Sequence, residues 1–236
     1  MLIINEERLL KRIHTLGAVG LDAEGTCHIR TRLAASDEDK AGRDLVSRWM
    51  SEAGLTVVTD YIGNLFGIWV PEGCADAAPL MLGSHIDTVI NAGQFDGCYG
   101  VLTALEVVET LKASGFVPAC PIAIGAFTNE EGVRYAPDMM GSLVYAGGYP
   151  LEKALASVGT DGTVLGEELR RIGYAGTVEP GFLKPCAFVE LHIEQGPILD
   201  AEGISIGAVE NLQGISWQRV TIEGEQNHAG TTPTAY

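Results

Sequence analysis

Three short apolar segments that each end in a polar cluster constrain the fold of this chain more than any other feature of its sequence. Each cluster contains His, Asp or Glu, and each follows a run long enough for one buried strand. The segments and clusters are 80–83 with Ser84-His85-Ile86-Asp87, 121–127 with Thr128-Asn129-Glu130-Glu131, and 187–191 with His192-Ile193-Glu194-Gln195. Buried strands joined by helices predict an α/β fold with a mixed, mostly parallel sheet flanked by helices. Ligands bind outside the carboxyl ends of such strands, so we expect the clusters to share one site.

The rest of the chain predicts further elements and a second domain. The predicted elements are helices over 5–16, over 100–113 and from the candidate N-cap Ser36 to about Gly54, and strands over 55–60 and 64–70. From about residue 204 the pattern changes to two alternating strands, 204–210 and 215–223, with no helix between them. We therefore expect one domain over 1–210 and the beginning of a smaller α+β domain over 211–236.

Composition argues against several classes of function. The chain has 236 residues, 46% of them hydrophobic and 19% charged, so it can bury a sizeable core. Its formal net charge of −16 repels phosphate backbones, so we expect no nucleic-acid partner. The longest apolar runs are far shorter than a membrane span, and the five scattered cysteines favour a reducing compartment. We therefore expect a cytoplasmic protein that does not bind a membrane.

The polar clusters carry donors that suit a hydrolytic metal site. Asp96 lies between glycines in a segment where the backbone can turn tightly. Ligands of His, Asp and Glu type, without Cys, suit zinc, manganese or cobalt with open coordination positions. In the pair Glu130-Glu131, one carboxylate can bind metal while the other serves as general base. Each cluster alone is more often a turn or solvated surface, but their coincidence at three strand ends favours a metal site.

Five motifs, in order along the chain, resemble one family. They are GSHIDTV at 83–89, GQFDG at 93–97, NEEGVRY at 129–135, HIEQGP at 192–197 and NHAGTTP at 227–233. With them the chain is similar to the M20-type metallopeptidase and amidohydrolase group, and within it to the hydantoinase/carbamoylase branch. That branch includes N-carbamoyl-L-amino acid hydrolases, β-ureidopropionase and allantoate amidohydrolase. The resemblance implies a zinc-aminopeptidase-like catalytic domain followed by a smaller lid or dimerisation domain.

The resemblance also implies two divalent metal ions, zinc before manganese or cobalt. His85 and His192 would bind one ion and Glu131 the other, while Asp96 would bridge the two. Asp87 would hydrogen-bond His85 and so fix the tautomer and orientation of its ring.

The same resemblance implies a reaction in which water cleaves the C–N bond of an N-carbamoyl amino acid or a related ureido acid. Glu130 would take a proton from the attacking water and deliver it to the leaving nitrogen. His228 would bind substrate and stabilise the oxyanion from the partner subunit, so a homodimer is expected. Gln195 is a further candidate for substrate contact.

Members of this group continue well past the position where this chain stops. The continuation would return to the catalytic domain. It would supply a further His ligand to the second metal ion and many of the contacts that bind the substrate carboxylate. We therefore expect the chain to be truncated at its C-terminus. Three alternatives remain open: allantoate as substrate, a dipeptide as substrate, or an inactive remnant. A glycosidase with paired carboxylates does not explain the histidines at the strand ends.

Overall fold

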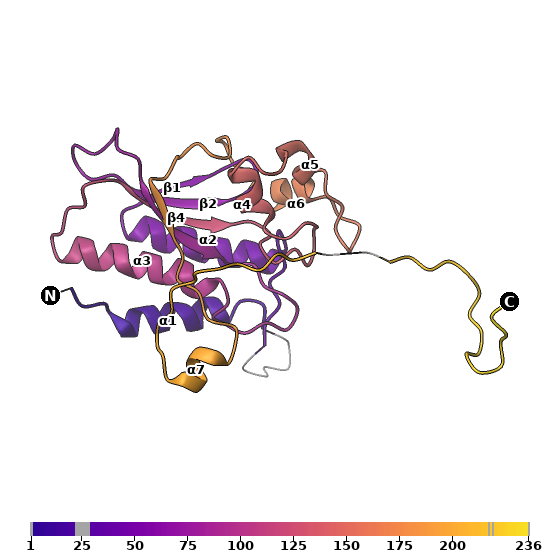
Figure 1. The fold of residues 1–236 in the computed structure, drawn as a ribbon. Coiled ribbons are helices and arrows are strands. Elements are labelled where there is room, and N and C mark those ends of the chain that lie inside the picture. The colour runs from indigo at the N-terminus through magenta and orange to yellow at the C-terminus, as the bar shows by residue number, and fades with distance from the viewer. Residues whose placement is uncertain (1, 22–28, 217, 219, 236) are drawn as a thin grey trace. The chain divides into compact units, whose positions relative to one another are not determined.

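One mixed sheet organises the part of the chain that the computed structural model describes, residues 2–21, 29–216, 218 and 220–235 (Figure 1). Its strands are β1 (Thr56–Thr59), β2 (Leu65–Trp69), β3 (Leu80–His85), β4 (Ile122–Phe127) and β5 (Ala187–Val189), in the order β1-β2-β4-β3-β5. The pairs β1-β2 and β2-β4 are antiparallel, whereas β3 runs parallel to both β4 and β5. The predicted mixed α/β sheet is confirmed, with its parallel strands gathered on one side.

Two of the helices begin at a side chain that caps them. The helices are α1 (Glu6–Gly17), α2 (Asp37–Glu52), α3 (Cys98–Ala113), α4 (Met140–Tyr145), α5 (Leu151–Leu155), α6 (Leu165–Ile172) and α7 (Ile198–Glu202). The side chain of Asn5 accepts a hydrogen bond from the Arg8 amide, and that of Ser36 accepts one from the Asp39 amide. Each satisfies an amide that a helix N-terminus leaves without an internal partner. The helices predicted at these positions are confirmed.

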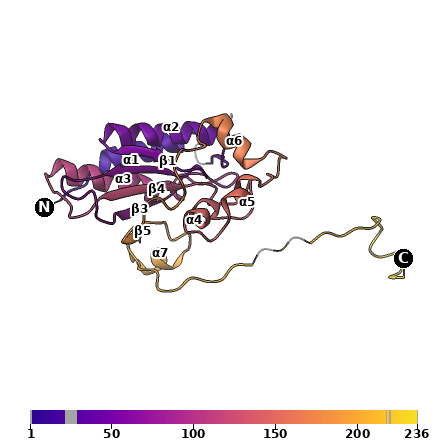
Figure 2. The ribbon, with the colours of Figure 1, turned by 90° about the horizontal axis from the view of Figure 1, so that it is seen from above.

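Helices cover the two faces of the sheet unequally. Figure 2 shows α1, α2 and α3 on one side of the sheet and α4 on the other. On the α4 side, the Tyr145 ring packs against Phe66 and Phe127, with ring centroids 5.3 and 5.8 Å apart. The opposite face supplies the larger apolar core, in which α2 and α3 contribute buried side chains such as Met50 and Leu102. Together these layers hold β3 and β4 in place.

β5 differs from the buried strand that its apolar sequence predicts. It has three residues and pairs on one side only, with β3. Phe188 is 45% exposed and Val189 54% exposed. An edge strand is covered only where another element packs on it, and within the first compact unit these two side chains stay accessible. The prediction of a strand at this position is confirmed, and the prediction that it is buried is wrong.

The described residues divide into two compact units, Met1–Ile193 and Glu194–Tyr236. In the second unit the strands predicted over 204–210 and 215–223 do not form among the described residues. Alternation supplies an apolar face, but a strand also needs a partner for its backbone amides and carbonyls, and no described segment of this unit pairs with these residues. The assignment of 211–236 to a lid or dimerisation domain stays a prediction.

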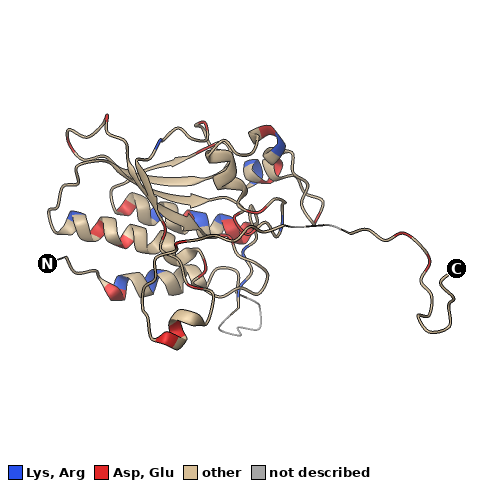
Figure 3. Cartoon of the chain, in the orientation of Figure 1, with Lys and Arg blue, Asp and Glu red and all other residues tan. Residues whose placement is uncertain are grey.

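The helices that carry most of the basic residues also carry acidic ones. Figure 3 shows Lys and Arg interspersed with Asp and Glu on α1, α2 and α6. Among the described residues, no helix combines the length and the apolar character needed to cross a bilayer.

Candidate metal centre

The carboxyl ends of the three parallel strands lie together at one edge of the sheet. His85 is the last residue of β3 and stands opposite Phe127, the last residue of β4. Glu130 and Glu131 follow shortly after β4, and His192 follows shortly after β5. The three clusters that the sequence places at strand ends therefore come from adjacent strands of one sheet.

His85, Asp96 and His192 form a compact group of donor atoms, called the donor trio below. Each residue offers one atom, and these atoms all lie within 4.8 Å of one another. Nε2 of His192 lies 3.1 Å from Oδ1 of Asp96, and Nε2 of His85 lies 3.8 Å from the same oxygen. Two imidazole nitrogens facing one carboxylate oxygen match the ligand chemistry of zinc and related divalent ions.

Both imidazole rings of the donor trio are oriented by main-chain carbonyls. Nδ1 of His85 lies 3.0 Å from the carbonyl oxygen of Asp87, and Nδ1 of His192 lies 2.8 Å from that of Ile193. A carbonyl oxygen only accepts, so Nδ1 of each ring is the donor. This arrangement leaves Nε2 of each ring directed at Asp96 and available to a metal ion.

Asp87 contributes to the site differently from what the resemblance implies. Its main-chain carbonyl, and not its carboxylate, is the partner of His85. The buried carboxylate instead accepts hydrogen bonds from the amides of Glu130 and Glu131, both at 3.2 Å. Burial raises the pKa of Asp87, and these two amide donors act in the opposite direction. Asp87 thus connects the end of β3 to the loop that carries both glutamates.

Gly97 allows Asp96 to approach His85. Its φ is +62°, a left-handed conformation that favours glycine. A Cβ atom at this position would lie 2.4 Å from both Cε1 and Nε2 of the His85 ring. The glycine that follows Asp96 is therefore required by the close packing of the turn on the imidazole.

The charges of the donor trio stabilise one another. The hydrogen bond to Asp96 raises the pKa of His192 to about 9, and the same hydrogen bond lowers the pKa of Asp96. Burial alone would lower the pKa of His85, but the neighbouring carboxylates of Asp87 and Glu130 outweigh it, so this pKa lies above its ordinary value. A cation that binds here would replace the protons on the two imidazoles.

Glu130 and Glu131 lie beside the donor trio but outside it. Oε2 of Glu130 lies 3.5 Å from Nε2 of His85. Burial raises the pKa of Glu130, and it raises the pKa of Glu131 to about 7. Oε1 of Glu131 is buried and has no hydrogen-bond partner. A buried carboxylate oxygen without a partner is costly, and coordination of a cation would offset that cost. The donor set therefore fits the divalent metal that the sequence predicts.

Gln195 and His228 belong to the second compact unit, whereas the donor trio and both glutamates belong to the first. His228 is exposed, and its Nδ1 accepts a hydrogen bond from the Gly230 amide at 3.0 Å. Gln195 is exposed, with a φ of +51°. The roles of these two side chains toward substrate stay predictions.

Two further residues near the site were not assigned a role from sequence. Oγ of Ser84 donates a hydrogen bond to Oε1 of Glu190 at 2.5 Å. Ser84 directly precedes His85, and Glu190 lies two residues before His192. A glutamate inside the otherwise apolar segment 187–191 is a signal that could have drawn attention to Glu190.

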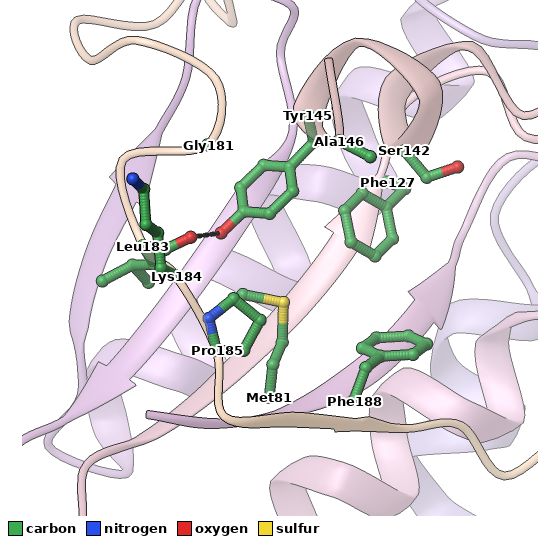
Figure 4. Close-up of a pocket in the computed structure, with 10 residues that line it drawn as sticks. All are labelled: Met81, Phe127, Ser142, Tyr145, Ala146, Gly181, Leu183, Lys184, Pro185 and Phe188. Atoms are coloured by element: carbon green, nitrogen blue, oxygen red, sulfur yellow. Dashed lines mark hydrogen bonds between the residues drawn. The ribbon is translucent and has the colours of Figure 1, made fainter. Parts of the chain in front are cut away.

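A separate apolar pocket lies on the α4 face of the sheet (Figure 4). Its volume is about 510 Å³, and its lining includes Met81, Phe127 and Phe188. The hydroxyl of Tyr145 donates a hydrogen bond to the Leu183 carbonyl at 2.5 Å. None of the predicted site residues lines this pocket.

Comparison with known proteins agrees with the motifs. Residues 81–235 match the profile of Peptidase family M20/M25/M40. An N-carbamoyl-L-amino-acid amidohydrolase of Rhizobium meliloti is 41% identical over 98% of this chain and 54% of its own length. A ureidoglycolate hydrolase of Arabidopsis thaliana is 40% identical over 87% of this chain and 45% of its own length.

Solved structures show the same relationship. A hydantoinase/carbamoylase family amidase from Burkholderia ambifaria superimposes with a TM-score of 0.81 and 44% identity, over 86% of this chain and 49% of that one. The chain thus spans about half the length of the relatives it matches.

Proposed function

Because the chain belongs to Peptidase family M20/M25/M40, we propose that it carries the metal-binding part of an amidohydrolase. The substrate class would be N-carbamoyl amino acids and related ureido acids. The observation that carries this proposal is the donor trio at the ends of parallel strands, next to a buried Glu131 oxygen that lacks a partner. Relatives named N-carbamoyl-L-amino-acid amidohydrolase and ureidoglycolate hydrolase support the choice of substrate class.

The residues present would hold two divalent ions. His85, Asp96 and His192 would bind the first, and Asp96 together with Glu131 would bind the second. Zinc is the first expectation because two imidazoles and carboxylates suit it, with manganese or cobalt as alternatives. When bound, such ions supply Lewis acidity that polarises water and the scissile carbonyl group.

Glu130 is the residue proposed to move protons. Its Oε2 lies 3.5 Å from Nε2 of His85, and burial raises its pKa, which makes this carboxylate a stronger proton acceptor than an exposed glutamate. Glu130 would take a proton as the water oxygen bonds to the carbonyl carbon. It would return that proton to the nitrogen as the C–N bond breaks. The two amide hydrogen bonds to Asp87 would hold the loop of Glu130 and Glu131 in place during these steps.

Substrate-binding roles for Gln195 and His228, a homodimer and a cytoplasmic location belong to the same proposal. His228 is proposed to act in the active site of the partner subunit, where an imidazole donor can stabilise a developing oxyanion. Allantoate and dipeptides remain the alternative substrates, and an inactive remnant is the alternative to an enzyme.

Metal titration of the 236-residue chain tests the proposal most directly. We expect Zn²⁺, Mn²⁺ or Co²⁺ to bind, and we expect His85→Ala to weaken binding strongly because it removes a ligand. His14→Ala is the matched control, since His14 is an exposed histidine of α1. Ammonia release from N-carbamoyl-L-amino acids should be measured on this chain and on a form with the full length of its relatives. Equal metal affinity in wild type and His85→Ala would contradict the proposed site.

A further inference from the structure

Ser84 and Glu190 connect the two chain segments that carry the histidines of the donor trio. The Ser84 hydroxyl donates to the Glu190 carboxylate at 2.5 Å, across a separation of 106 residues in sequence. Ser84 is buried, with 3% of its surface exposed. A hydrogen bond to a charged carboxylate is stronger than one between neutral groups, so this contact can hold two segments together.

The contact lies where the backbone pairing of β3 and β5 has ended. The ladder between these strands runs from Leu80 with Ala187 to Leu82 with Val189. On its other side, β3 remains paired with β4 as far as His85. His85 is therefore positioned by the sheet itself, whereas His192 lies beyond the last backbone pair of its own strand.

The segment that leads to His192 also packs against the first turn of α3. A Cβ atom at Gly100 would lie 2.6 Å from the carbonyl oxygen of Leu191 and 2.8 Å from Cβ of Ser84. The lack of a side chain at Gly100 thus lets Ser84 and Leu191, the residue after Glu190, approach the helix. The hydrogen bond to Glu190 and the close packing of Leu191 on Gly100 both restrain the segment that leads to His192.

We propose that Ser84 and Glu190 are positioning residues, whose hydrogen bond sets the distance between His85 and His192. The two imidazole rings have centroids 6.3 Å apart, and both Nε2 atoms face the same oxygen of Asp96. A cation must contact both rings at once, so its affinity depends on that separation. This inference rests on the proposed metal site and assigns a role to two residues outside its ligand set.

Ser84→Ala removes the hydrogen bond without changing any charge. We expect this variant of the 236-residue chain to bind Zn²⁺ and Co²⁺ about tenfold or more weakly, the loss typical when a partner that orients a metal ligand is removed. The visible spectrum of bound Co²⁺ should change as well, because the ligand geometry changes. Ser51→Ala is the matched control, since the Ser51 hydroxyl donates to the Ser47 carbonyl within α2. Glu190→Gln, which keeps an oxygen acceptor, should lose less affinity than Glu190→Ala.

Testing Ser84→Ala in a His192→Ala chain distinguishes a role in positioning the histidines from a role in stabilising the fold. In a His192→Ala chain the distance between the histidines no longer matters, so adding Ser84→Ala should cost little further metal affinity. Thermal unfolding of every variant in EDTA reports stability independently of the metal.

Wild-type affinity and an unchanged Co²⁺ spectrum in Ser84→Ala would overturn the inference, as would a full loss that persists in the His192→Ala background. A wild-type chain that binds no divalent ion would overturn the proposed metal site and this inference together.

Discussion

The two histidines of the donor trio share one arrangement, in which Nδ1 donates to a main-chain carbonyl and Nε2 faces Asp96. Because both rings are held in this orientation, even one added carbon atom next to a ring would disturb the position of the metal ligands. Gly97 is the clearest case, because the space that a side chain would need is already filled by the His85 ring.

Gly97→Ala should sharply reduce metal affinity. The new Cβ would overlap the His85 ring, and the φ of +62° is unfavourable for alanine, so either the ring or the turn that carries Asp96 must move. Gly93→Ala is the matched control, since a Cβ there meets nothing within 4 Å. Titration calorimetry with Zn²⁺ checks the prediction, and equal affinities in the two variants would contradict it.

Glu130→Gln should separate catalysis from metal binding. Glutamine keeps the shape of the side chain but cannot accept the proton, so turnover in an active form of the protein should fall by about 10²–10⁴. Metal content should remain that of wild type, because Glu130 is not among the proposed ligands of either ion. Ammonia release and elemental analysis on the same preparation measure both quantities. Unchanged turnover with metal bound would rule out this role.

At the scale of elements, a buried polar cluster connects the β1–β2 turn to the end of β4 and the start of α4. The Asp60 carboxylate accepts hydrogen bonds from the Asn64 amide and from its side-chain Nδ2, at 2.8 and 2.9 Å. The same Nδ2 donates to the Gly141 carbonyl, and the Asn64 side-chain oxygen accepts from the Thr128 amide. Thr128 directly precedes the loop of Asn129, Glu130 and Glu131, so this cluster fixes the position where that loop begins.

Asp60 should make the folded state less stable as pH rises from about 4 to 6. Burial raises the pKa of this carboxyl from 3.8 to about 6. Below that window both states are protonated. Within it the folded state still holds a proton that the unfolded state has released, so a higher pH favours unfolding.

Relative to Asp60→Asn, the free energy of unfolding of wild type should therefore fall by at most about 3 kcal/mol across this window and stay level above it. Denaturant unfolding of both proteins at several pH values in EDTA gives the difference between their free energies of unfolding. The other titrating groups affect both proteins equally, so their contributions cancel in this difference. If the free energies of unfolding of the two proteins change in parallel with pH, burial does not shift the pKa of this carboxyl.

At the scale of the whole molecule, the proposed metal-binding residues are confined to one of the two compact units. His85, Asp96, Glu131 and His192 all lie within Met1–Ile193, as does Glu130, the residue proposed to move protons. The residues with predicted roles toward substrate, Gln195 and His228, lie in the other unit. Metal binding and substrate binding are therefore assigned to different parts of the chain.

A chain of residues 1–193 should bind the first divalent ion with about the affinity of the 236-residue chain. All three members of the donor trio are present in it, together with the sheet that positions them. At a free metal concentration 100 times the dissociation constant, binding should stabilise either chain by about 2.7 kcal/mol. Thermal unfolding with and without Zn²⁺ measures this stabilisation. Its loss in the shorter chain alone would place an essential ligand beyond Ile193.

Sequence by itself determined α1, α2, α3 and the five strands of the sheet, and it identified the candidate metal ligands. Asn5 and Ser36 mark helix starts because capping depends on a side chain and an amide three residues away. Apolar runs placed β3, β4 and β5, and the residues that follow each run identified the candidate donors. These signals are legible in sequence because they depend on residue type and short spacing.

Only the tertiary structure decided which groups meet. The main chain of Asp87, rather than its carboxylate, is the partner of His85, and Ser84 bonds to Glu190 across 106 residues. The strands predicted after residue 204 lack a pairing partner among the described residues, and β5 is exposed at the edge of the sheet. Burial, strand pairing and ring orientation depend on neighbours that are distant in the chain, and no local pattern encodes those neighbours.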